Sequence, residues 1–398
     1  MPELLVEVAD TIRSVERLRA DWTALIAAGA RPGPFQDWPW IRAWIDHAVD
    51  EEDTSADRRK TKRSLHPWFV IVRERETASP LMICPMQLDR HIGLKRLTWF
   101  SVPALQEGGI IAVPMPEEKR QAALEAALAA MKQAPADFLD FRLMAQDGPV
   151  ASWLASRCRK GMDNAAYLVD FSEFSDWRAF ELSLKSSARR SRKKRLNRMR
   201  KAGEVRFIVH EDPREIARLL DVALGWKRQW LKERGVEDAL PERPWFAAFL
   251  KALPETNTGN ARWVIAELSF NGRPAAVDFG AIANGVFHAY LSAYDEGLRT
   301  HSPGKIALWL MLQWCMEQGL SAYDMLANPA PYKEDWANRT RPLDQYILPL
   351  SMGGRAYALW ASRLRDVAAQ CYHTLPENVR APLSGYLRRL RGGVAKNG

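Results

Sequence analysis

The sequence has few cysteines and histidines. Its cysteines do not cluster and include no C-x-x-C pair, and its seven histidines include no H-E-x-x-H motif. The four cysteines are Cys84, Cys158, Cys315 and Cys371. Widely spaced cysteines are typical of free thiols in a reducing compartment. The sequence therefore predicts a cytoplasmic protein without a metal site.

Long apolar runs are also missing. No stretch approaches the roughly 20 apolar residues of a membrane span. The first residues, MPELLVEVADTIRS, carry acids early and lack a basic region followed by an apolar core, so we expect no signal peptide. A hydrophobic content of 47% and sixteen tryptophans predict a well-packed globular protein, and 398 residues predict two domains.

Acidic residues are absent from residues 185–201, KSSARRSRKKRLNRMRK, which hold ten lysines and arginines. The net charge of the whole chain is +9, so the rest of the chain is near neutral. This run is either a site for a phosphorylated or nucleic-acid partner, with Arg189 and Arg190 as candidate binding residues, or a solvated helix face. Leu196 and Met199, three residues apart, predict a helix with one docked edge.

A nucleotide P-loop is missing as well, although Gly304-Lys305 precedes a long apolar helix. That motif needs a glycine five positions earlier and a hydroxyl residue after the lysine, where this chain has Arg299 and Ile306. The free N–H groups and positive dipole at a helix start still favour an anion. The turn therefore remains a candidate phosphate site, but a kinase or ATPase is a poor interpretation.

Two stretches share the order strand, strand, strand, helix, strand. In the first copy these elements are expected at 67–74, 80–88, 95–102, 117–133 and 137–144. In the second they are expected at 262–270, 275–283, 286–294, 304–318 and 321–326. Asn-Gly pairs at 271–272 and 284–285 predict hairpin turns, and Gly319 closes the helix. Asp140 and Asp324 hold similar places in the last strands.

We therefore predict a duplicated α/β (α+β) fold with two mixed sheets flanked by helices. The first domain, 1–165, is a degenerate copy without the Arg299–Lys305 turn, and the second, 166–375, is the catalytic domain. Residues 376–398 are expected to form a basic tail, and 51–64 an exposed loop.

Polar residues on the second copy's strands are candidates for chemistry. Asp278 interrupts an apolar strand, so it has either a structural partner or a raised pKa and a catalytic role as general base. On the next strand, alternation places His288, Tyr290, Ser292 and Tyr294 on one polar face. His288 and His301 are further candidate bases, or simply packed polar residues.

A third group follows the last strand of the second copy, in the sequence YDMLANPAPYKEDW. Ligands collect at the carboxyl ends of strands in open sheets, so these side chains are candidate substrate contacts. They are Asp324, Tyr332, Lys333 and Trp336. Lys333 is placed to contact a phosphate or a developing oxyanion, or it is a surface lysine beside an aromatic anchor.

Residues 293–336 resemble the acetyltransferase domain of the CelD/BcsL type, which belongs to the GNAT superfamily and is related to the FemAB aminoacyl transferases. The matching features are Tyr294-Asp295, Ser302-Pro303-Gly304 with its helix, Tyr323-Asp324, and Tyr332-Lys333 with Trp336. The basic run before AGEVRF is also similar to that family, so the likeness covers about 170–345. The first 165 residues fit the general duplicated GNAT layout.

The resemblance implies an acyl-CoA loop of the form R/Q-x-x-G-x-G/A over Arg299–Gly304, with Ser302 where glycine is usual and Pro303 removing one N–H donor. The residues implied to bind the CoA pyrophosphate are Arg299, Thr300, His301, Ser302, Gly304 and Lys305. A lysine at the position of Lys333 supports acyl transfer in FemAB-type proteins. The implied reaction is direct attack on the thioester, with Asp278 or His288 as base and Tyr294 as acid to the thiolate.

Three functions remain open on the sequence. The first is an acyl-CoA-dependent N- or O-acyltransferase, acting with acetyl-CoA or another acyl-CoA on a sugar, an amino-sugar or a bacterial envelope or polysaccharide precursor. The second is a FemAB-like aminoacyl transferase that uses aminoacyl-tRNA, with the basic run on RNA phosphates. The third is a non-catalytic protein that binds a nucleic acid or another anionic partner through the basic helix.

Overall fold

The computed structural model describes residues 4–49, 66–148, 150–235, 240–255, 259–327 and 330–364. The expected loop at 51–64 and the expected tail at 376–398 lie outside these residues. The chain divides into two compact units. Unit 1 comprises Met1–Ala30, Asp50–Asn164 and Pro342–Gly398, and unit 2 comprises Arg31–Val49 and Ala165–Arg341. This division differs from the predicted domains in the segment 31–49 and in the residues from Pro342 on.

Unit 1 contains the first copy of the predicted repeat. Its elements are β1 (Leu4–Ala9), α1 (Ile12–Glu16), α2 (Arg19–Ala27), β2 (His66–Pro67), β3 (Phe69–Glu74), β4 (Pro80–Cys84), β5 (Met86–His91), β6 (Leu94–Trp99), β7 (Ile111–Ala112), α4 (Glu117–Met131), β8 (Phe138–Ala145), α5 (Ala151–Ala155), α12 (Met352–Leu359) and η4 (Trp360–Leu364). Two strands, β9 (Arg159–Asp170) and β15 (Arg339–Pro349), are divided between the units.

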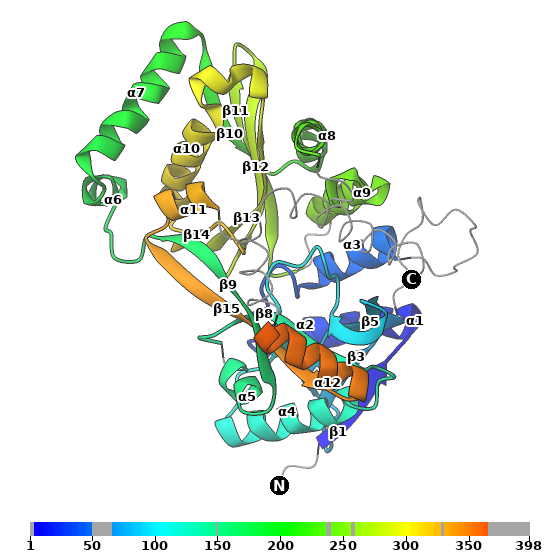
Figure 1. Cartoon of the computed structure of the whole chain (residues 1–398). Helices are drawn as coiled ribbons and strands as arrows, with labels where there is room; N and C mark the ends of the chain where they lie inside the picture. Colours follow the sequence, from blue (N-terminus) through cyan, green and yellow to red (C-terminus); the bar gives the residue numbers. More distant parts are fainter. Residues whose placement is uncertain are drawn as a thin grey trace. The chain divides into compact units, whose positions relative to one another are not determined.

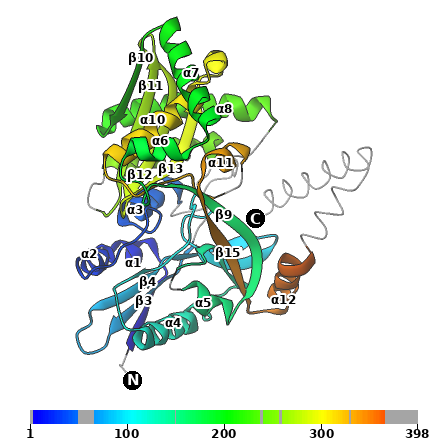
Figure 2. The ribbon, with the colours of Figure 1, turned by 90° about the vertical axis from the view of Figure 1, so that its left-hand side faces the viewer.

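The strands of unit 1 run in the orders β1-β3-β4-β7 and β15-β8-β6-β5-β2. Helix α4 packs along β1 and β3 (Figure 2). The strand predicted at 80–88 is broken after Cys84, so that β4 and β5 lie in different runs. Strands β6 and β8 pair in parallel, which is possible because the long connection through α4 returns the chain to the same edge.

Unit 2 contains the second copy. Its elements are α3 (Trp38–Ala48), α6 (Trp177–Ser183), α7 (Ser186–Ala202), β10 (Val205–His210), α8 (Pro213–Glu233), η1 (Leu240–Glu242), α9 (Pro244–Ala252), η2 (Leu253–Glu255), β11 (Arg262–Phe270), β12 (Arg273–Ala283), β13 (Val286–Tyr294), η3 (Glu296–His301), α10 (Pro303–Glu317), β14 (Ala322–Asp324) and α11 (Pro331–Trp336). Its strands run in the order β10-β11-β12-β13-β14-β9.

The turn chemistry of unit 2 follows from its sequence. Both Asn-Gly pairs have positive φ at both residues, as the tight turns between antiparallel strands require, and they join β11 to β12 and β12 to β13. Helix α10 begins at Pro303 and is followed by Gly319 at a φ of 71°. The predicted hairpins and the helix closure are therefore confirmed.

The sheet of unit 2 is covered on both faces. Helix α10 packs on β11, β12 and β13 from one side, and α8 covers the same strands from the other (Figure 1). The core under α10 joins Phe287 and Tyr323 to Trp309, Met311 and Cys315 of the helix. Both units thus have mixed sheets flanked by helices, so the predicted fold class is confirmed.

We predict that Gly280→Ala destabilises the protein by about 2–3 kcal/mol, because a methyl group there overpacks the sheet. A Cβ at Gly280 lies 2.3 Å from the carbonyl oxygen of His288 and 2.6 Å from Cζ of Phe287. Denaturant unfolding measures the change.

The control is Gly225→Ala in α8, where an added Cβ meets no atom within 4 Å among the described residues. It is expected to raise the free energy of unfolding by about 0.5–1 kcal/mol, because alanine favours helix over glycine. Equal effects of the two substitutions would contradict the close approach at Gly280.

Candidate functional site

Strand β13 has one extra residue in the middle of its pairing with β12. Phe279 pairs with Leu291, but the next residue, Gly280, pairs with Ala289, so Tyr290 is an extra residue and forms a β-bulge. Residues paired across an antiparallel ladder point to the same face, so the bulge inverts the alternation of β13.

The bulge corrects the prediction of a single polar face on β13. Ser292 and Tyr294 are on the face that α10 covers, where Ser292 reaches Asp278 and Tyr294 lies against Gly304. Tyr290 instead joins an aromatic cluster with Phe35, Trp40 and Trp263, and His288 is on that same face by its pairing with Ala281. Alternation alone is wrong here because one inserted residue changes its phase.

Asp278 is the most constrained polar group on the α10 face. Its carboxylate is buried and accepts hydrogen bonds from the Tyr323 hydroxyl at 2.5 Å and from the Ser292 hydroxyl at 2.8 Å. Burial raises the pKa of Asp278 to about 6, against the lowering effect of both hydrogen bonds. Ser292 is exposed, so it connects this buried carboxylate to the surface. The arrangement suits a group that takes up and releases a proton near neutral pH.

His288 and Asp324 form a second polar cluster, on the other face. Nδ1 of His288 lies 3.7 Å from Oδ2 of Asp324, and Arg341 donates to the same oxygen at 3.3 Å. Asp324 also accepts the backbone N–H of Leu326, which has a left-handed φ of 60°. Burial lowers the pKa of His288 below its ordinary value, against the raising effect of Asp324. The structure therefore places the two proposed bases, Asp278 and His288, on opposite faces.

The side chain of Lys333 binds backbone carbonyl groups rather than an anion. Its Nζ donates to the carbonyl oxygens of Leu326 and Ala327 at 3.1 and 2.7 Å, and burial lowers the pKa of Lys333 to about 8. The neighbouring Tyr332 is exposed, and the partial burial of its ring together with the charge of Asp278 raises its pKa. Helix α11 thus brings Tyr332 toward the Asp278 cluster and fixes the chain that leaves β14.

The turn before α10 has the backbone shape that glycine usually supplies. Ser302 is left-handed, with φ 58° and ψ 50°, and its carbonyl accepts the N–H groups of Lys305 and Ile306. Among the described residues, Gly304 N–H has no acceptor. A Cβ at Gly304 would lie 3.1 Å from Cδ1 of Tyr294, so a larger residue would press on that ring.

The polar side chains of this turn are arranged around its outer surface. Arg299, Thr300 and Lys305 are exposed, and the ring of His301 lies tilted against that of Phe270 with ring centroids 5.4 Å apart. Tyr294 donates to Glu296 at 3.1 Å. Two exposed cations and a free backbone donor at a helix start are the elements of an anion site.

The basic run forms α7, which packs beside α10 and η3 (Figure 1). Met199 is fully buried and Leu196 packs on the same cluster, which confirms the predicted docked edge. Arg198 donates to the carbonyl of Thr300 at 2.5 Å and so ties the helix to the turn. Arg189 bonds the carbonyls of Leu182 and Leu184, whereas exposed Arg190 has no described partner.

Sequence reasoning missed several residues of this region. Ser292 and Tyr323 were noted in the patterns, but nothing in the sequence shows that both donate to Asp278, because the contact depends on the bulge and on the parallel pairing of β13 with β14. Arg192 was not separated from the other cations of the run. Trp336 lies against its guanidinium, 3.7 Å from Cζ to the ring centroid.

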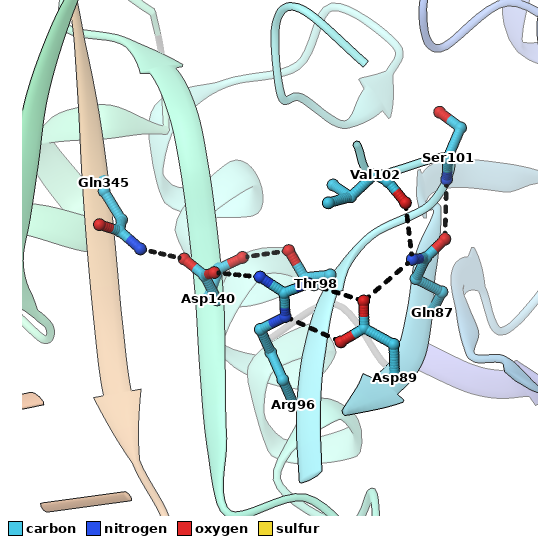
Figure 3. A network of polar contacts seen from close by, with 8 residues as sticks. All are labelled: Gln87, Asp89, Arg96, Thr98, Ser101, Val102, Asp140 and Gln345. Carbon is cyan, nitrogen blue, oxygen red and sulfur yellow. Dashed lines mark hydrogen bonds and ion pairs between the residues drawn. The ribbon is translucent and has the colours of Figure 1, made fainter. Parts of the chain in front are cut away.

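In unit 1 the corresponding position is filled by an ion-pair network (Figure 3). Asp140 is paired with Thr98 across the parallel strands, as Asp324 is paired with His288, so the predicted similarity of the two aspartates is confirmed. Arg96 bonds Asp140 at 3.1 Å and Asp89 at 2.6 Å, and Gln345 donates to Asp140 at 2.7 Å. Every side chain in this buried group has a partner.

Two negative findings apply to the described residues alone. No group of three or more histidine, cysteine, aspartate or glutamate side chains there could hold a metal ion. None of the helices in that part of the chain has the length and apolar character needed to cross a membrane.

Residues 186–334 match the family model described as Acetyltransferase (GNAT) domain. This segment runs from the start of α7 into α11 and so includes the Asp278 cluster and the turn before α10. This match confirms the predicted enzyme class, an acyltransferase of the GNAT type. No curated protein matches the sequence at a significant level.

Solved structures with low sequence identity share the fold. FemX has a TM-score of 0.57 at 10% identity, covering 89% of this chain and 99% of that one. The C-terminal domain of a putative lysylphosphatidylglycerol synthetase from Agrobacterium fabrum has a TM-score of 0.52 at 12% identity, covering 86% and 95%. A conserved protein of unknown function from Bacteroides thetaiotaomicron VPI-5482 has a TM-score of 0.51 at 12% identity, covering 86% and 99%.

We predict that Asp278→Asn changes how stability depends on pH. The carboxyl of Asp278 has a pKa of about 6 when folded against an ordinary value of 3.8, so its ionisation favours the unfolded chain. The stability of the wild type relative to the variant is therefore highest below pH 4 and is lost as the pH rises through 6. Roughly two pKa units correspond to about 3 kcal/mol.

Denaturant unfolding of both proteins between pH 4 and 8 measures this difference. Ser292→Ala is the control, because it removes a hydrogen bond from the carboxylate but leaves the titrating group in place. A wild-type minus Asp278→Asn difference that is constant over this range would mean that Asp278 does not titrate there.

Proposed function

We propose that the chain is an acyl-CoA-dependent N- or O-acyltransferase that binds the CoA pyrophosphate at the turn Arg299–Lys305. The observation that carries this proposal is the left-handed Ser302 followed by the free N–H of Gly304 at the start of α10, within the segment that matches the acetyltransferase model. Exposed Arg299 and Lys305 supply positive charge beside that donor. Acetyl-CoA is the donor that we propose.

The acceptor that we propose is a sugar, an amino-sugar or an envelope or polysaccharide precursor, in line with the resemblance to the CelD/BcsL type. An amine or hydroxyl of the acceptor attacks the thioester carbonyl, so that a C–N or C–O bond forms and the C–S bond breaks. The nucleophile's proton passes to Asp278 through Ser292, which bonds the carboxylate and is exposed. Tyr294 then protonates the CoA thiolate.

Asp278 is preferred to His288 as the base for two reasons. The Asp278 pKa of about 6 leaves it ionised yet basic at neutral pH. It also shares the α10 face with Tyr294 and the donor turn, whereas His288 is on the opposite face with Asp324. Lys333 is proposed to position the end of β14 rather than to contact the reacting atoms.

Donor binding is tested by thermal melting with acetyl-CoA. We expect acetyl-CoA to raise the melting temperature, because a ligand that binds only the folded state stabilises it by mass action. The double variant Arg299→Ala with Lys305→Ala should abolish the shift. Arg214→Ala with Lys232→Ala, which removes two exposed charges from α8, should keep it.

An aminoacyl transferase that uses aminoacyl-tRNA is the second candidate, favoured by the shared fold with FemX and by the exposed cations of α7. A stabilising shift with tRNA and none with any CoA thioester would overturn the acyl-CoA proposal in its favour. No shift with either ligand would indicate a non-catalytic binding protein.

The base assignment is tested by CoA release from acetyl-CoA across a panel of amine and sugar acceptors. We expect Asp278→Asn to lower kcat/KM by about 10²–10⁴-fold, and the wild-type rate to rise with pH through about 6 as the carboxyl ionises. His288→Gln should keep that pH profile. A profile abolished by His288→Gln and retained by Asp278→Asn would reverse the assignment.

A further inference from the structure

Arg192 differs from the other cations of α7 in its surroundings. Its guanidinium packs against two indole rings, with Cζ 4.8 Å from the ring centroid of Trp309 and 3.7 Å from that of Trp336. Only 9% of its surface is exposed. In the part of the chain that the structure describes, no carboxylate or carbonyl accepts a hydrogen bond from this side chain, and Nη1 is fully buried without a partner.

The neighbouring cations of α7 have hydrogen-bond or ion-pair partners. Arg189 and Arg198 donate to backbone carbonyls, and Lys193 forms an ion pair with Glu181. These contacts leave the three side chains partly solvated. Arg192 is both the most buried of the group and the one with an orphan N–H, so its position is not explained by solvation or by an internal ion pair.

Burying the Arg192 guanidinium costs free energy unless an acceptor binds its N–H groups. Burying a charge without a hydrogen-bonding partner costs several kcal/mol, and each desolvated cation–π contact returns about 2 kcal/mol or more, without satisfying the N–H donors. Burial lowers the pKa of Arg192 to about 10, which still leaves it charged at neutral pH. The aromatic rings attract the charge but do not accept the five N–H groups as an oxyanion does.

Through its two indole contacts, Arg192 lies beside the helix that follows the donor turn and beside α11. Trp309 follows Gly304 by five residues in α10, which is about 7.5 Å along the helix. Trp336 is four residues after Tyr332 in α11, so both are on one side of that helix, and Tyr332 senses the charge of Asp278. Arg192 is thus linked through Trp309 to the helix of the donor turn and through Trp336 to the helix that carries Tyr332.

We propose that Arg192, with Trp309 and Trp336, forms a subsite for an oxyanion of the acyl acceptor, either a carboxylate or a phosphate. The inference rests on the proposed acyltransferase function and narrows its acceptor to an anionic molecule. A guanidinium held by two aromatic rings presents N–H groups in a fixed fork, which suits both oxyanions. The donor phosphates are served separately, by the turn and by the exposed cations beside it.

Direct binding of two probes tests the subsite. Inorganic phosphate and acetate are titrated into the protein by calorimetry at constant ionic strength. Wild type should bind at least one of them saturably, and Arg192→Gln should weaken that binding by at least tenfold. Whichever probe binds more tightly identifies the oxyanion.

Lys194→Gln is the matched control, because it also removes one positive charge, from an exposed position two residues away in the same helix. It should bind the probe as wild type does. Equal weakening by both variants, or binding by Arg192→Gln equal to wild type, would overturn the proposal and leave α7 as a general basic surface.

Arg192→Met separates a binding role from a structural one. If Arg192 serves to bind a ligand, replacing it with a methionine of similar length removes an unpaired buried charge. The melting temperature without ligand should then stay the same or rise, while probe binding is lost. A clearly lower melting temperature would show that the arginine is a packing residue and overturn the proposal.

Competition with CoA assigns the subsite to the acceptor. Saturating CoA should leave phosphate or acetate binding at Arg192 intact, and displacement of the probe would place Arg192 in the donor site and overturn the assignment. The two proposals fail separately. Loss of acetyl-CoA binding at the turn with an intact probe site contradicts the acyl-CoA function, and the reverse result contradicts the subsite.

Discussion

The approach of Gly280 to the carbonyl of His288 sets the geometry of unit 2. Without a side chain at that position, β13 can fit Tyr290 as an extra residue against β12 and still continue its ladder. The inverted alternation then sends Ser292 toward Asp278 and leaves His288 beside Asp324. Two polar clusters that share two strands are thereby kept apart, with different protonation behaviour on each face of the sheet.

Much of the fold could be predicted from the sequence, because local chemistry decides it. The Asn-Gly turns, the start of α10 at its proline and the docked edge of α7 all depend on residues within a few positions. The strand expected at 80–88 was wrong because a proline at position 85 divides it between two runs of strands. The periodicity of apolar residues does not show that strand pairing is interrupted at that residue.

The sequence predicted which residues belong to the candidate site better than it predicted how they are arranged. Asp278 and the turn before α10 are visible as a charge in an apolar strand and as a motif. Their partners are not visible, because Tyr323 reaches Asp278 from a strand 45 residues away. The burial of Arg192 is equally hidden, since its neighbours in the sequence are cations of the same kind and only packing on Trp309 and Trp336 separates it from them.

Helix α11 is six residues long, and three of its residues interact with other parts of unit 2. The charge of Asp278 raises the pKa of Tyr332, Lys333 donates to two backbone carbonyls and Trp336 lies against Arg192. Each residue of a helix is rotated by about 100° from the one before it. Insertion or deletion of a single residue inside α11 would therefore turn at least one of the three away from its partner, whereas many point substitutions would leave the spacing intact. Among relatives of this chain, the length of this helix should be more tightly limited than its composition.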